Sequence, residues 1–526
     1  MEASVFNSLA AVVIALLVYY SRKTRRRYPP GPRGLPFVGN VLDVPRDGPG
    51  WLTYARWSRE YESDVIYMSL LGTPVIVLNS IKAATELFEK RSSIYSDRQR
   101  TVMMHEYVKG DRSFSFLGYG DEWREHRRLF HQYFSGSAIE NYHPKILKEA
   151  RKVLTRLHTS DDFMKTFRVM AAAVVLGVTF GMEIEDTTDP YVVIAEEAIN
   201  TILQAAVPGA FMVDYVPISE LIAVKQTGRL TNSRIVRYIP SWAPGGGFKR
   251  TGTEWHKLMS TMIAEPFRFV KEGLAAGAAK PSIAAALLEK LDESDVNAMR
   301  EYEVAQQVTS TAYLGAADTT VSALGTFVLC MVMNPSVQAI AQGEIDRIVG
   351  NDSLPDFTYR DELPYISAIM YEVLRFQPVA PLGVPHRLMV DDEYAGYHLP
   401  AGAMVVGNIW AIMHDPERFP NPEAFDPTRW LTPDGQLSET ADAMAAFGFG
   451  RRICPGRYFA MESMWMTIAH ILSVYSIEKP VDDFGNTVEP SGKYVPGFLT
   501  YPEPFKTVFK PRSSAALSLV RPMLGD

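Results

Sequence analysis

The stretch Phe447-Gly448-Phe449-Gly450-Arg451-Arg452-Ile453-Cys454-Pro455-Gly456 contains one of the two cysteines in this sequence of 526 residues. Cys454 has neighbours that suit a metal-ligating thiolate. The adjacent basic pair supplies positive potential, which favours the ionised sulfur, and the glycines let backbone come close to it. Pro455 suits the first position of a helix, so we expect Cys454 at a helix N-terminus, where the dipole favours an anion. The plainer interpretation is a buried cysteine beside surface arginines.

The same stretch resembles the haem-binding signature of the cytochrome P-450 family, Phe-x-x-Gly-x-Arg-x-Cys-x-Gly. Phe447, Gly450, Arg452, Cys454 and Gly456 match it without a gap. The resemblance implies that Cys454 is the axial ligand of a haem b iron and that Arg452 reaches a haem propionate. It also implies the cytochrome P-450 fold, which is mainly α-helical with small β-sheets. In such proteins the thiolate favours cleavage of the O–O bond.

Composition limits the class of protein. Hydrophobic residues make up 47% and charged residues 21% of the sequence, which is ordinary for a globular chain with a large core. The net charge of −7 argues against a nucleic-acid partner. Two cysteines exclude a disulfide framework, which fits a reducing compartment. The second cysteine, Cys330, lies in an apolar run and is expected in the core.

The N-terminal segment predicts a membrane anchor followed by a linker. Residues 3–20 are almost entirely apolar, and eighteen helical residues span roughly 27 Å, enough to cross a hydrocarbon core. Five Lys and Arg residues follow within residues 22–27, and the positive-inside rule places them in the cytosol. A cleaved signal peptide would carry its charge before the apolar run. Residues 21–36, basic and then rich in proline, predict a semi-rigid linker.

This arrangement predicts a single-pass protein of the endoplasmic reticulum membrane whose catalytic domain faces the cytosol. The catalytic domain is expected over residues 37–510, with a C-terminal tail over residues 511–526. The sequon Asn351-Asp352-Ser353 offers a check. A glycan on Asn351 would contradict the cytosolic orientation.

Three further segments match cofactor-binding positions of the family. Trp123 and Arg127 lie four residues apart in a segment of helical composition, so they share one face. The resemblance implies that both grip a haem propionate; a cation–π contact is the alternative. It also implies propionate contacts for Arg98 and His386. An ordinary surface arginine and a hydrogen-bonded polar histidine are the alternatives there.

Residues 304–333 contain no proline and predict one helix of roughly 45 Å. Its centre reads Gly315-Ala316-Ala317-Asp318-Thr319-Thr320. Asp and Thr are unfavourable inside a buried helix, although a threonine hydroxyl bonded to the preceding turn would explain them. The family pattern implies instead a local opening of the helix, where Asp318 and Thr319 are catalytic and relay protons on the oxygen-binding side of the haem. The family usually has glycine where this chain has Ala316, so the depth of the opening is left open.

Glu372 and Arg375 match a structural Glu-x-x-Arg pair of the family. The spacing by itself is not specific, because it recurs at Glu125–Arg128, Glu265–Arg268 and Glu344–Arg347. The position of Glu372 just before Gln377-Pro378 and upstream of Cys454 favours it. We expect Arg429, within a Phe-x-Pro-x-Arg-aromatic frame, as the third member in preference to Arg418. Such a triad is charge-assisted and stabilises the fold without taking part in the chemistry.

The resemblance implies a haem-dependent monooxygenase that inserts one oxygen atom from O2 into a small apolar organic substrate. The chain is most similar to fungal microsomal members of secondary metabolism. By position only, the residues expected to line the substrate cavity are Tyr313, Ala316, Val379, Leu382 and Phe498.

The implied electron source is NADPH, which acts through a membrane-bound NADPH–cytochrome reductase, a flavoprotein. Cytochrome b5 is a second candidate partner. Arg124 and Arg128 are candidates for a basic docking face, and a plain solvated face is the alternative.

Two other functions stay open on the sequence. An isomerase or dehydratase of the same fold would act on a pre-oxidised substrate and turn over without NADPH. A non-catalytic membrane haem carrier or sensor would have no need of Asp318 and Thr319.

Overall fold

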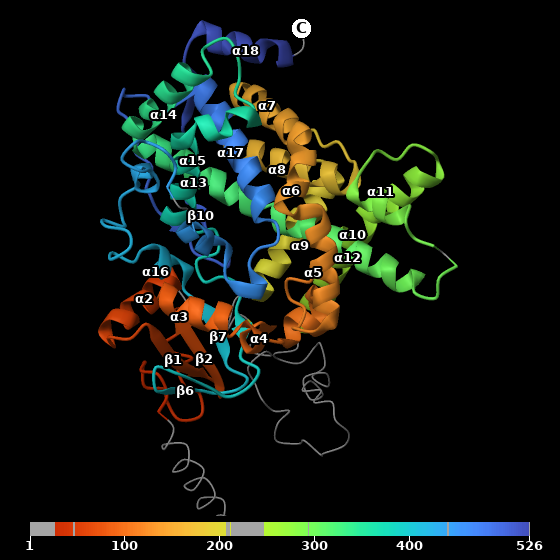
Figure 1. Ribbon diagram of the computed structural model, residues 1–526, viewed down its shortest axis with the longest axis vertical. Coiled ribbons are helices and arrows are strands. Elements are labelled where there is room, and N and C mark those ends of the chain that lie inside the picture. The colour runs from red at the N-terminus through yellow and green to blue at the C-terminus, as the bar shows by residue number, and fades with distance from the viewer. Residues whose placement is uncertain are drawn as a thin grey trace, which may run out of the picture.

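The computed structural model describes residues 27–45, 48–206, 211, 247–292, 294–438 and 441–524. The predicted anchor, residues 3–20, and the basic start of the predicted linker lie outside the described residues. Helices form most of the described molecule, and the largest sheet lies at one end (Figure 1). This architecture agrees with the mainly helical fold with small sheets that the sequence predicts.

The α-helices are α2 Gly50–Glu60, α3 Ile81–Ala84, α4 Ser92–Tyr95, α5 Asp121–Phe134, α6 Gly136–Ile139, α7 His143–Thr159, α8 Phe163–Phe180, α9 Pro190–Ala206, α10 Phe248–Ala275, α11 Ile283–Leu288, α12 Ala298–Ala316, α13 Thr319–Met333, α14 Pro335–Ile348, α15 Pro364–Phe376, α16 Ile409–Met413, α17 Arg457–Val474 and α18 Ser514–Leu524. Short helices of other types are η1 Thr85–Lys90, η2 Met103–Val108, η3 Gly110–Arg112, η4 Glu140–Tyr142, η8 Phe357–Glu362, η9 Pro427–Trp430, η10 Ala441–Phe447 and η11 Gly450–Arg452.

The strands are β1 Val65–Leu70, β2 Thr73–Leu78, β3 Asp97–Arg98, β4 His386–Arg387, β5 Asp392–Tyr394, β6 Tyr397–Leu399, β7 Met404–Gly407, β8 Tyr475–Glu478, β9 Tyr494–Val495, β10 Tyr501–Pro502 and β11 Val508–Pro511. The largest sheet has five strands in the order β1-β2-β7-β4-β3. β3 and β4 pair antiparallel with Arg98 opposite His386. The sheet register thus brings together two candidate site residues that are distant in the sequence.

β1 and β2 form a hairpin in which Val65 pairs with Leu78. The two residues of its turn, Leu71 and Gly72, have φ values of 48° and 90°. Positive φ at both positions matches the right-handed twist of the flanking strands, and glycine adopts it without strain.

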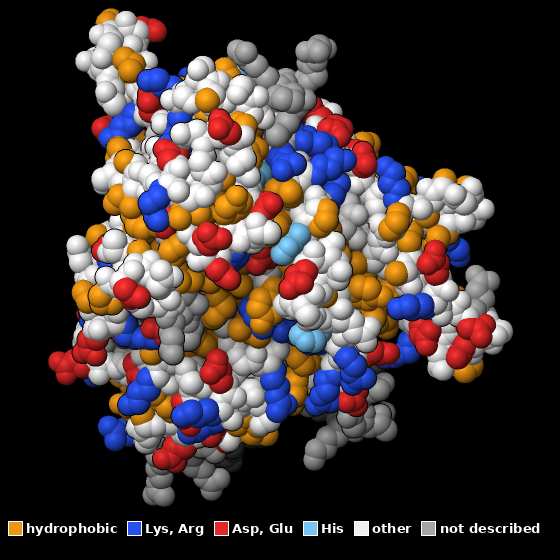
Figure 2. All heavy atoms as spheres, turned by 45° about the horizontal axis from the view of Figure 1, so that its top comes forward, with side chains coloured by type: hydrophobic (Ala, Val, Ile, Leu, Met, Phe, Trp, Pro, Cys, Tyr) orange, Lys and Arg blue, Asp and Glu red, His pale blue; other side chains and the backbone are white. Residues whose placement is uncertain are grey.

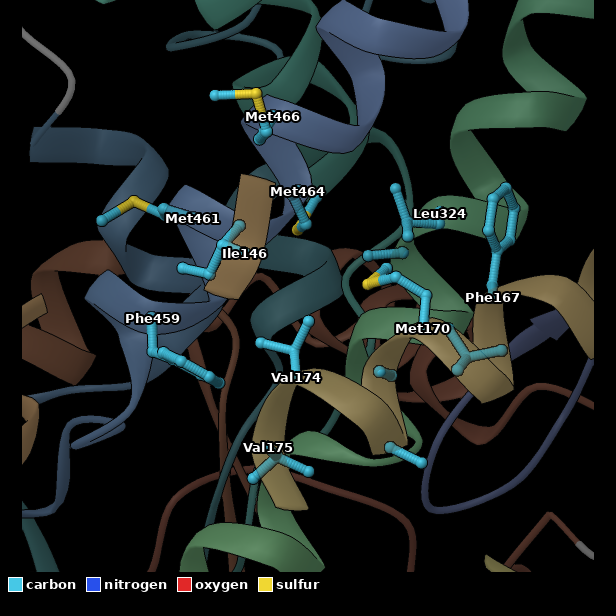
Figure 3. Packing of buried hydrophobic residues seen from close by; sticks show 14 of the residues in the cluster. Ile146, Phe167, Met170, Val174, Val175, Leu324, Phe459, Met461, Met464 and Met466 are labelled. Atoms are coloured by element: carbon cyan, nitrogen blue, oxygen red, sulfur yellow. The ribbon is translucent and has the colours of Figure 1, made fainter. Parts of the chain in front are cut away.

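The main core lies where α7, α8, α13 and α17 meet (Figure 3). In this view Met464 of α17 and Val174 of α8 point toward one another, with Ile146 of α7 beside them. All three side chains are at most 1% exposed. α8 begins where the Asp162 carboxylate accepts from the Lys165 N–H at 2.9 Å, a side-chain N-cap. α13 and α17, which begin at Thr319 and Arg457 beside candidate site residues, are part of this core.

The predicted single helix over residues 304–333 is two helices. α12 starts earlier than expected, at Ala298, and ends at Ala316, and α13 begins at Thr319. The Thr319 hydroxyl donates to Gly315 O at 2.7 Å. A hydroxyl that bonds a carbonyl of the preceding turn competes with the helical ladder and bends it. The structure therefore shows both the local opening, at Ala317 and Asp318, and the alternative, a threonine hydroxyl bonded to the preceding turn.

The segment predicted as a C-terminal tail contains α18, which packs against α7. Val520 is fully buried and Ala516 is 6% exposed. Burial of such apolar side chains contributes to the stability of the core. Part of residues 511–526 therefore belongs to the core of the fold.

Two described helical segments are long and apolar enough to span a membrane: Phe163–Phe180 and Ala298–Met333. In each, more than 70% of the apolar window is buried inside the protein. Their apolar character is therefore explained by their place in the core.

Charged side chains of both signs mix with hydrophobic ones on the face shown in Figure 2. Nucleic-acid binding needs Lys and Arg gathered on one surface. The viewed face offers no such continuous basic field among its described residues.

Candidate functional site

Cys454 lies in a tight loop between η10 and α17. Its backbone N–H donates to Phe447 O at 2.8 Å, which closes the loop. Gly448 and Gly450 have φ values of 82° and 55°. Side chains strain such left-handed backbone, so glycine suits both positions. The spacing of the motif therefore reflects a single turn, in which the glycines occupy the positions that need left-handed backbone.

The helix after this loop begins later than the sequence predicts. Gly456 is the N-cap and Arg457 is the first helical residue, so the prediction that Pro455 opens the helix was wrong. Pro455 belongs to the turn before the helix. Cys454 nevertheless lies just ahead of a helix N-terminus, where backbone N–H groups favour an anion.

The protein surroundings of Cys454 act in opposite directions on its thiol. Burial raises the pKa of Cys454, and the Gly456 backbone N–H, Arg127 and Arg457 oppose that rise. Arg457 also donates to Cys454 O at 3.1 Å. A metal ion would complete the stabilisation, because a coordinating thiol loses its proton. The donor chemistry therefore fits a thiolate-bound metal.

Two glycines of the motif differ in the space around them. A Cβ added at Gly450 would lie 2.0 Å from Phe88 O, whereas one added at Gly456 meets no described atom within 4 Å. Gly450 is therefore required by the protein fold itself. The open space at Gly456 suits the approach of a group bound at Cys454.

Gly450→Ala is expected to destabilise the protein by roughly 2–3 kcal/mol, because it combines a strained φ with a backbone clash. Gly456→Ala is the matched control, and its cost is expected within about 0.5 kcal/mol when haem is absent. Chemical denaturation of both variants, with and without haem, measures this. Equal losses in the two haem-free variants would contradict the assignment.

Three side chains that can carry positive charge are buried together beside the sheet. Arg98, His386 and Arg452 are 8%, 8% and 9% exposed. Burial and the charge of Arg452 lower the pKa of Arg98, and burial lowers the pKa of Arg452 to about 9. Burial and both arginines hold the pKa of His386 well below its usual range. The charge of Asp97 opposes the fall in both arginine pKa values but is outweighed by burial, so the two guanidinium groups are only partly compensated.

The described contacts of the two guanidinium groups are mostly with backbone carbonyls. Arg98 donates to Val384 O at 2.6 Å and to Pro385 O at 2.9 Å. Arg452 donates to Ser96 O at 2.7 Å. Arginine in such a setting binds carboxylates well. A cofactor that carries carboxylates, such as haem, fits this cluster.

Trp123 and Arg127 both lie near this cluster, on α5. The Arg452 guanidinium carbon lies 4.5 Å from the centre of the Trp123 ring, so the described cation–π contact of Trp123 is with Arg452 and differs from the Trp123–Arg127 contact given as the alternative. Arg127 acts electrostatically on Cys454, and burial lowers its own pKa to about 10. α5 therefore lies near both Cys454 and Arg452, the two side chains of the motif that are proposed to bind the cofactor.

The helix break forms a second part of the site. Gly315 is exposed and residues 316–319 are half-buried, between runs of buried residues at 308–313 and 320–332. A Cβ added at Gly315 would meet no described atom within 4 Å. Open space therefore borders the break, and Asp318 and Thr319 lie beside it.

Asp318 and Thr319 have defined partners. The Tyr501 hydroxyl donates to Asp318 Oδ2, and the Thr319 hydroxyl bonds Gly315 O as described above. Burial raises the pKa of Asp318, and the bond from Tyr501 and the charge of Arg168 oppose that rise. The Asp318 carboxyl therefore keeps its proton to a higher pH than an exposed carboxyl does.

The five residues expected to line the cavity do not share one environment. Ala316, Val379, Leu382 and Phe498 are half-buried. Tyr313 is 1% exposed, and its hydroxyl donates to Tyr191 O at 2.7 Å. Tyr313 therefore packs against α9 and does not border the open space.

Glu372, Arg375 and Arg429 meet in the interior. Arg375 binds both carboxylate oxygens of Glu372 at 2.9 Å, and Arg429 Nε reaches Glu372 Oε1 at 3.3 Å. Trp430 Nε1 donates to Glu372 Oε2 at 2.9 Å. Both Glu372 and Arg375 are 0% exposed. Arg418, the rejected alternative, pairs with Asp442 elsewhere.

Sequence reasoning missed three residues that contact the site. Tyr501 binds Asp318, Arg457 affects Cys454, and Trp430 binds Glu372. Trp430 is the aromatic residue of the Phe-x-Pro-x-Arg-aromatic frame, directly after Arg429, so the sequence could have predicted its place in the triad. Tyr501 lies in a strand with no motif around it and could not be assigned from spacing.

Residues 29–509 match the family model described as cytochrome P-450. The match covers most of the chain and includes every candidate residue named above.

Several curated relatives are similar over nearly their whole length. Cytochrome P-450 monooxygenase 98 of Postia placenta is 40% identical over 97% of this chain and 95% of its own. Tryptamine 4-monooxygenase of Psilocybe cyanescens is 37% identical over 97% of this chain and 99% of its own. A cytochrome P-450 monooxygenase of Hericium erinaceus is 39% identical over 98% and 94%.

Proposed function

The chain belongs to the cytochrome P-450 family, and from that membership we propose that it is a membrane-bound monooxygenase acting on a small apolar metabolite. It is an oxidoreductase, and family membership implies a haem whose iron is held by a thiolate. The observation that carries the proposal is the Cys454 loop with its adjoining arginine cluster. The relative named for tryptamine supports a small organic substrate, and we assign the product to secondary metabolism.

Cys454 would hold the haem iron through its sulfur, within the turn closed by the bond from its N–H to Phe447 O. Its sulfur is the donor, and Arg127 supplies positive potential beside it. When bound, the haem supplies the oxygen-activating chemistry. The chain itself holds and orients that group.

The haem propionates are proposed to enter the cluster of Arg98, His386 and Arg452, with Trp123 packed against Arg452. An anion there would compensate the buried positive charge. His386 Nδ1 bonds Tyr95 O at 2.7 Å, so Nε2 is the nitrogen proposed to face the propionates.

Thr319 and Asp318 are proposed to deliver protons across the helix break. Thr319 holds its hydroxyl beside the open space through its bond to Gly315 O. Asp318, with its raised pKa, can pass a proton toward that hydroxyl and recover one from water. Ala316, Val379, Leu382 and Phe498 are proposed to contact the substrate and exclude water from it.

Electrons are proposed to come from NADPH through a membrane-bound flavoprotein reductase, with cytochrome b5 as an additional donor. Arg124 and Arg128 are exposed on α5, the helix that also carries Arg127. Arg124 pairs with Asp121 at 2.5 Å, which keeps its side chain at the surface. This face is proposed to meet an acidic donor, with the chain held in the endoplasmic reticulum membrane by residues 3–20 and its catalytic domain cytosolic.

Thr319→Ala is expected to divert electrons from product to hydrogen peroxide, lowering product yield by roughly tenfold or more. The measurement needs a substrate, which screening of small apolar metabolites for a haem spin-state shift would identify. Product and peroxide are then measured per NADPH in the reductase-reconstituted protein.

Thr309→Ala is the matched control, because Thr309 makes the same type of bond, to Ala305 O at 2.8 Å, within the buried part of α12. It is expected to keep the product yield. An unchanged yield in Thr319→Ala would argue against the proposed proton delivery.

A further inference from the structure

The helix break brings a phenol to a half-buried carboxyl. Tyr501 comes from β10, near the end of the chain, and its hydroxyl donates to Asp318 Oδ2 at the break between α12 and α13. Both side chains are half-buried. This contact joins segments that only the tertiary fold places together, so it is not a consequence of local helix geometry.

The position of Tyr501 is fixed by contacts that do not involve Asp318. The Ser322 hydroxyl on α13 donates to Thr500 O. Gln377 Nε2 donates to Thr500 Oγ1 at 3.2 Å, and Thr500 N donates to Val379 O at 3.0 Å. Thr500 is fully buried. The residue before Tyr501 is therefore anchored on two sides, and the phenol is presented to the carboxyl by the frame of the fold.

One further charged group acts on the carboxyl. Arg168 of α8 lowers the pKa of Asp318. Arg168 pairs with Glu196 of α9 at 3.6 Å, and the two side chains are 39% and 43% exposed. Burial and the charge of Asp318 raise the pKa of Glu196. A solvent-accessible ion pair thus lies within electrostatic reach of the half-buried pair formed by Tyr501 and Asp318.

We propose that Tyr501 is a positioning residue that holds the Asp318 carboxyl. The Arg168–Glu196 pair then lies at the solvent-exposed side from which water replaces the proton of Asp318. This rests on the proposed role of Asp318 in proton delivery. The phenol donates its hydrogen bond to the ionised carboxylate and so favours that form. Asp318 gives up one proton and takes one from water, while Tyr501 keeps its own throughout.

Tyr501→Phe removes the donor and keeps the ring. In the haem-loaded, full-length protein, the carboxylic C=O infrared band of Asp318 is identified as the band that Asp318→Asn removes. We expect this band to persist to higher pH in Tyr501→Phe than in the unchanged protein, because the ionised form has lost a stabilising bond. The carbon monoxide spectrum of the reduced protein checks that each variant is folded.

Tyr475→Phe is the matched control, because it removes another buried hydroxyl, which donates to Leu154 O at 2.6 Å with no carboxylate involved. It is expected to leave the Asp318 band unshifted. An unshifted band in folded Tyr501→Phe would overturn the positioning role. A shifted band together with an unchanged peroxide yield in Asp318→Asn would keep Tyr501 as the partner of Asp318 and overturn only the proposed proton delivery.

Discussion

Cys454→Ser is expected to abolish the thiolate-type Soret band of the reduced carbon monoxide complex and to lower oxygenation by more than about a hundredfold. Changes to groups that merely support a metal ligand already cost about 10–100-fold, so loss of the ligand itself should cost more. Serine lacks the polarisable sulfur, which ionises more readily than a hydroxyl and favours O–O cleavage. The measurements are the difference spectrum and reductase-supported turnover.

The second cysteine provides the control for this experiment. Cys330 is 2% exposed within α13, and burial raises its pKa well above the usual range. Cys330→Ser is expected to cost about 1–2 kcal/mol for burying a hydroxyl while leaving the spectrum intact. A Soret band that survives in Cys454→Ser but disappears in Cys330→Ser would reverse the assignment of the ligand.

Glu372→Gln is expected to lower the free energy of unfolding by about 3–5 kcal/mol, because it removes one partner of a fully buried ion pair. Arg375 would keep its charge at 0% exposure with two hydrogen bonds weakened. Arg429 bonds Oε1 and Trp430 bonds Oε2, and the single amide oxygen of glutamine can replace only one of these acceptors. Chemical denaturation, followed by circular dichroism, measures the loss.

Glu265→Gln tests whether burial or spacing is responsible for that loss. Glu265 and Arg268 have the same i, i+3 spacing on α10, but their side chains are 35% and 60% exposed. Exposed pairs contribute about 0.3–0.5 kcal/mol, so this variant should hardly change the unfolding midpoint. Similar losses in the two variants would show that the buried network contributes little.

The residues of the Cys454 loop could be located from the sequence because they are contiguous. A turn closed between Phe447 and Cys454 needs its glycines at set positions, and those positions are visible as a motif. The start of the next helix was misplaced at Pro455. Proline suits a first helical position, but the preceding turn uses it here.

The choice of Glu372 among four pairs of equal spacing rested on its sequence context. The structure places Glu372 and Arg375 in the interior, whereas Glu125 pairs with Arg300 and Glu344 accepts from backbone N–H groups. The pairs differ in how deeply their side chains are buried, and residue spacing alone does not indicate burial. Sequence context identified the right pair because the family frame that contains Arg429 and Trp430 also contacts the Glu372 carboxylate.

The sequence by itself located the loop around Cys454 and the Glu372–Arg375 pair, because each is encoded by residues that are close together in the chain. Helical composition predicted one long helix over residues 304–333, and only the family resemblance implied an opening in it. Only the tertiary structure decided that Arg98 lies opposite His386, that Tyr501 holds Asp318, and that α18 completes the core. These contacts join segments far apart in the sequence, and their partners are chosen by packing and sheet register. The local propensities of the residues do not specify packing or sheet register.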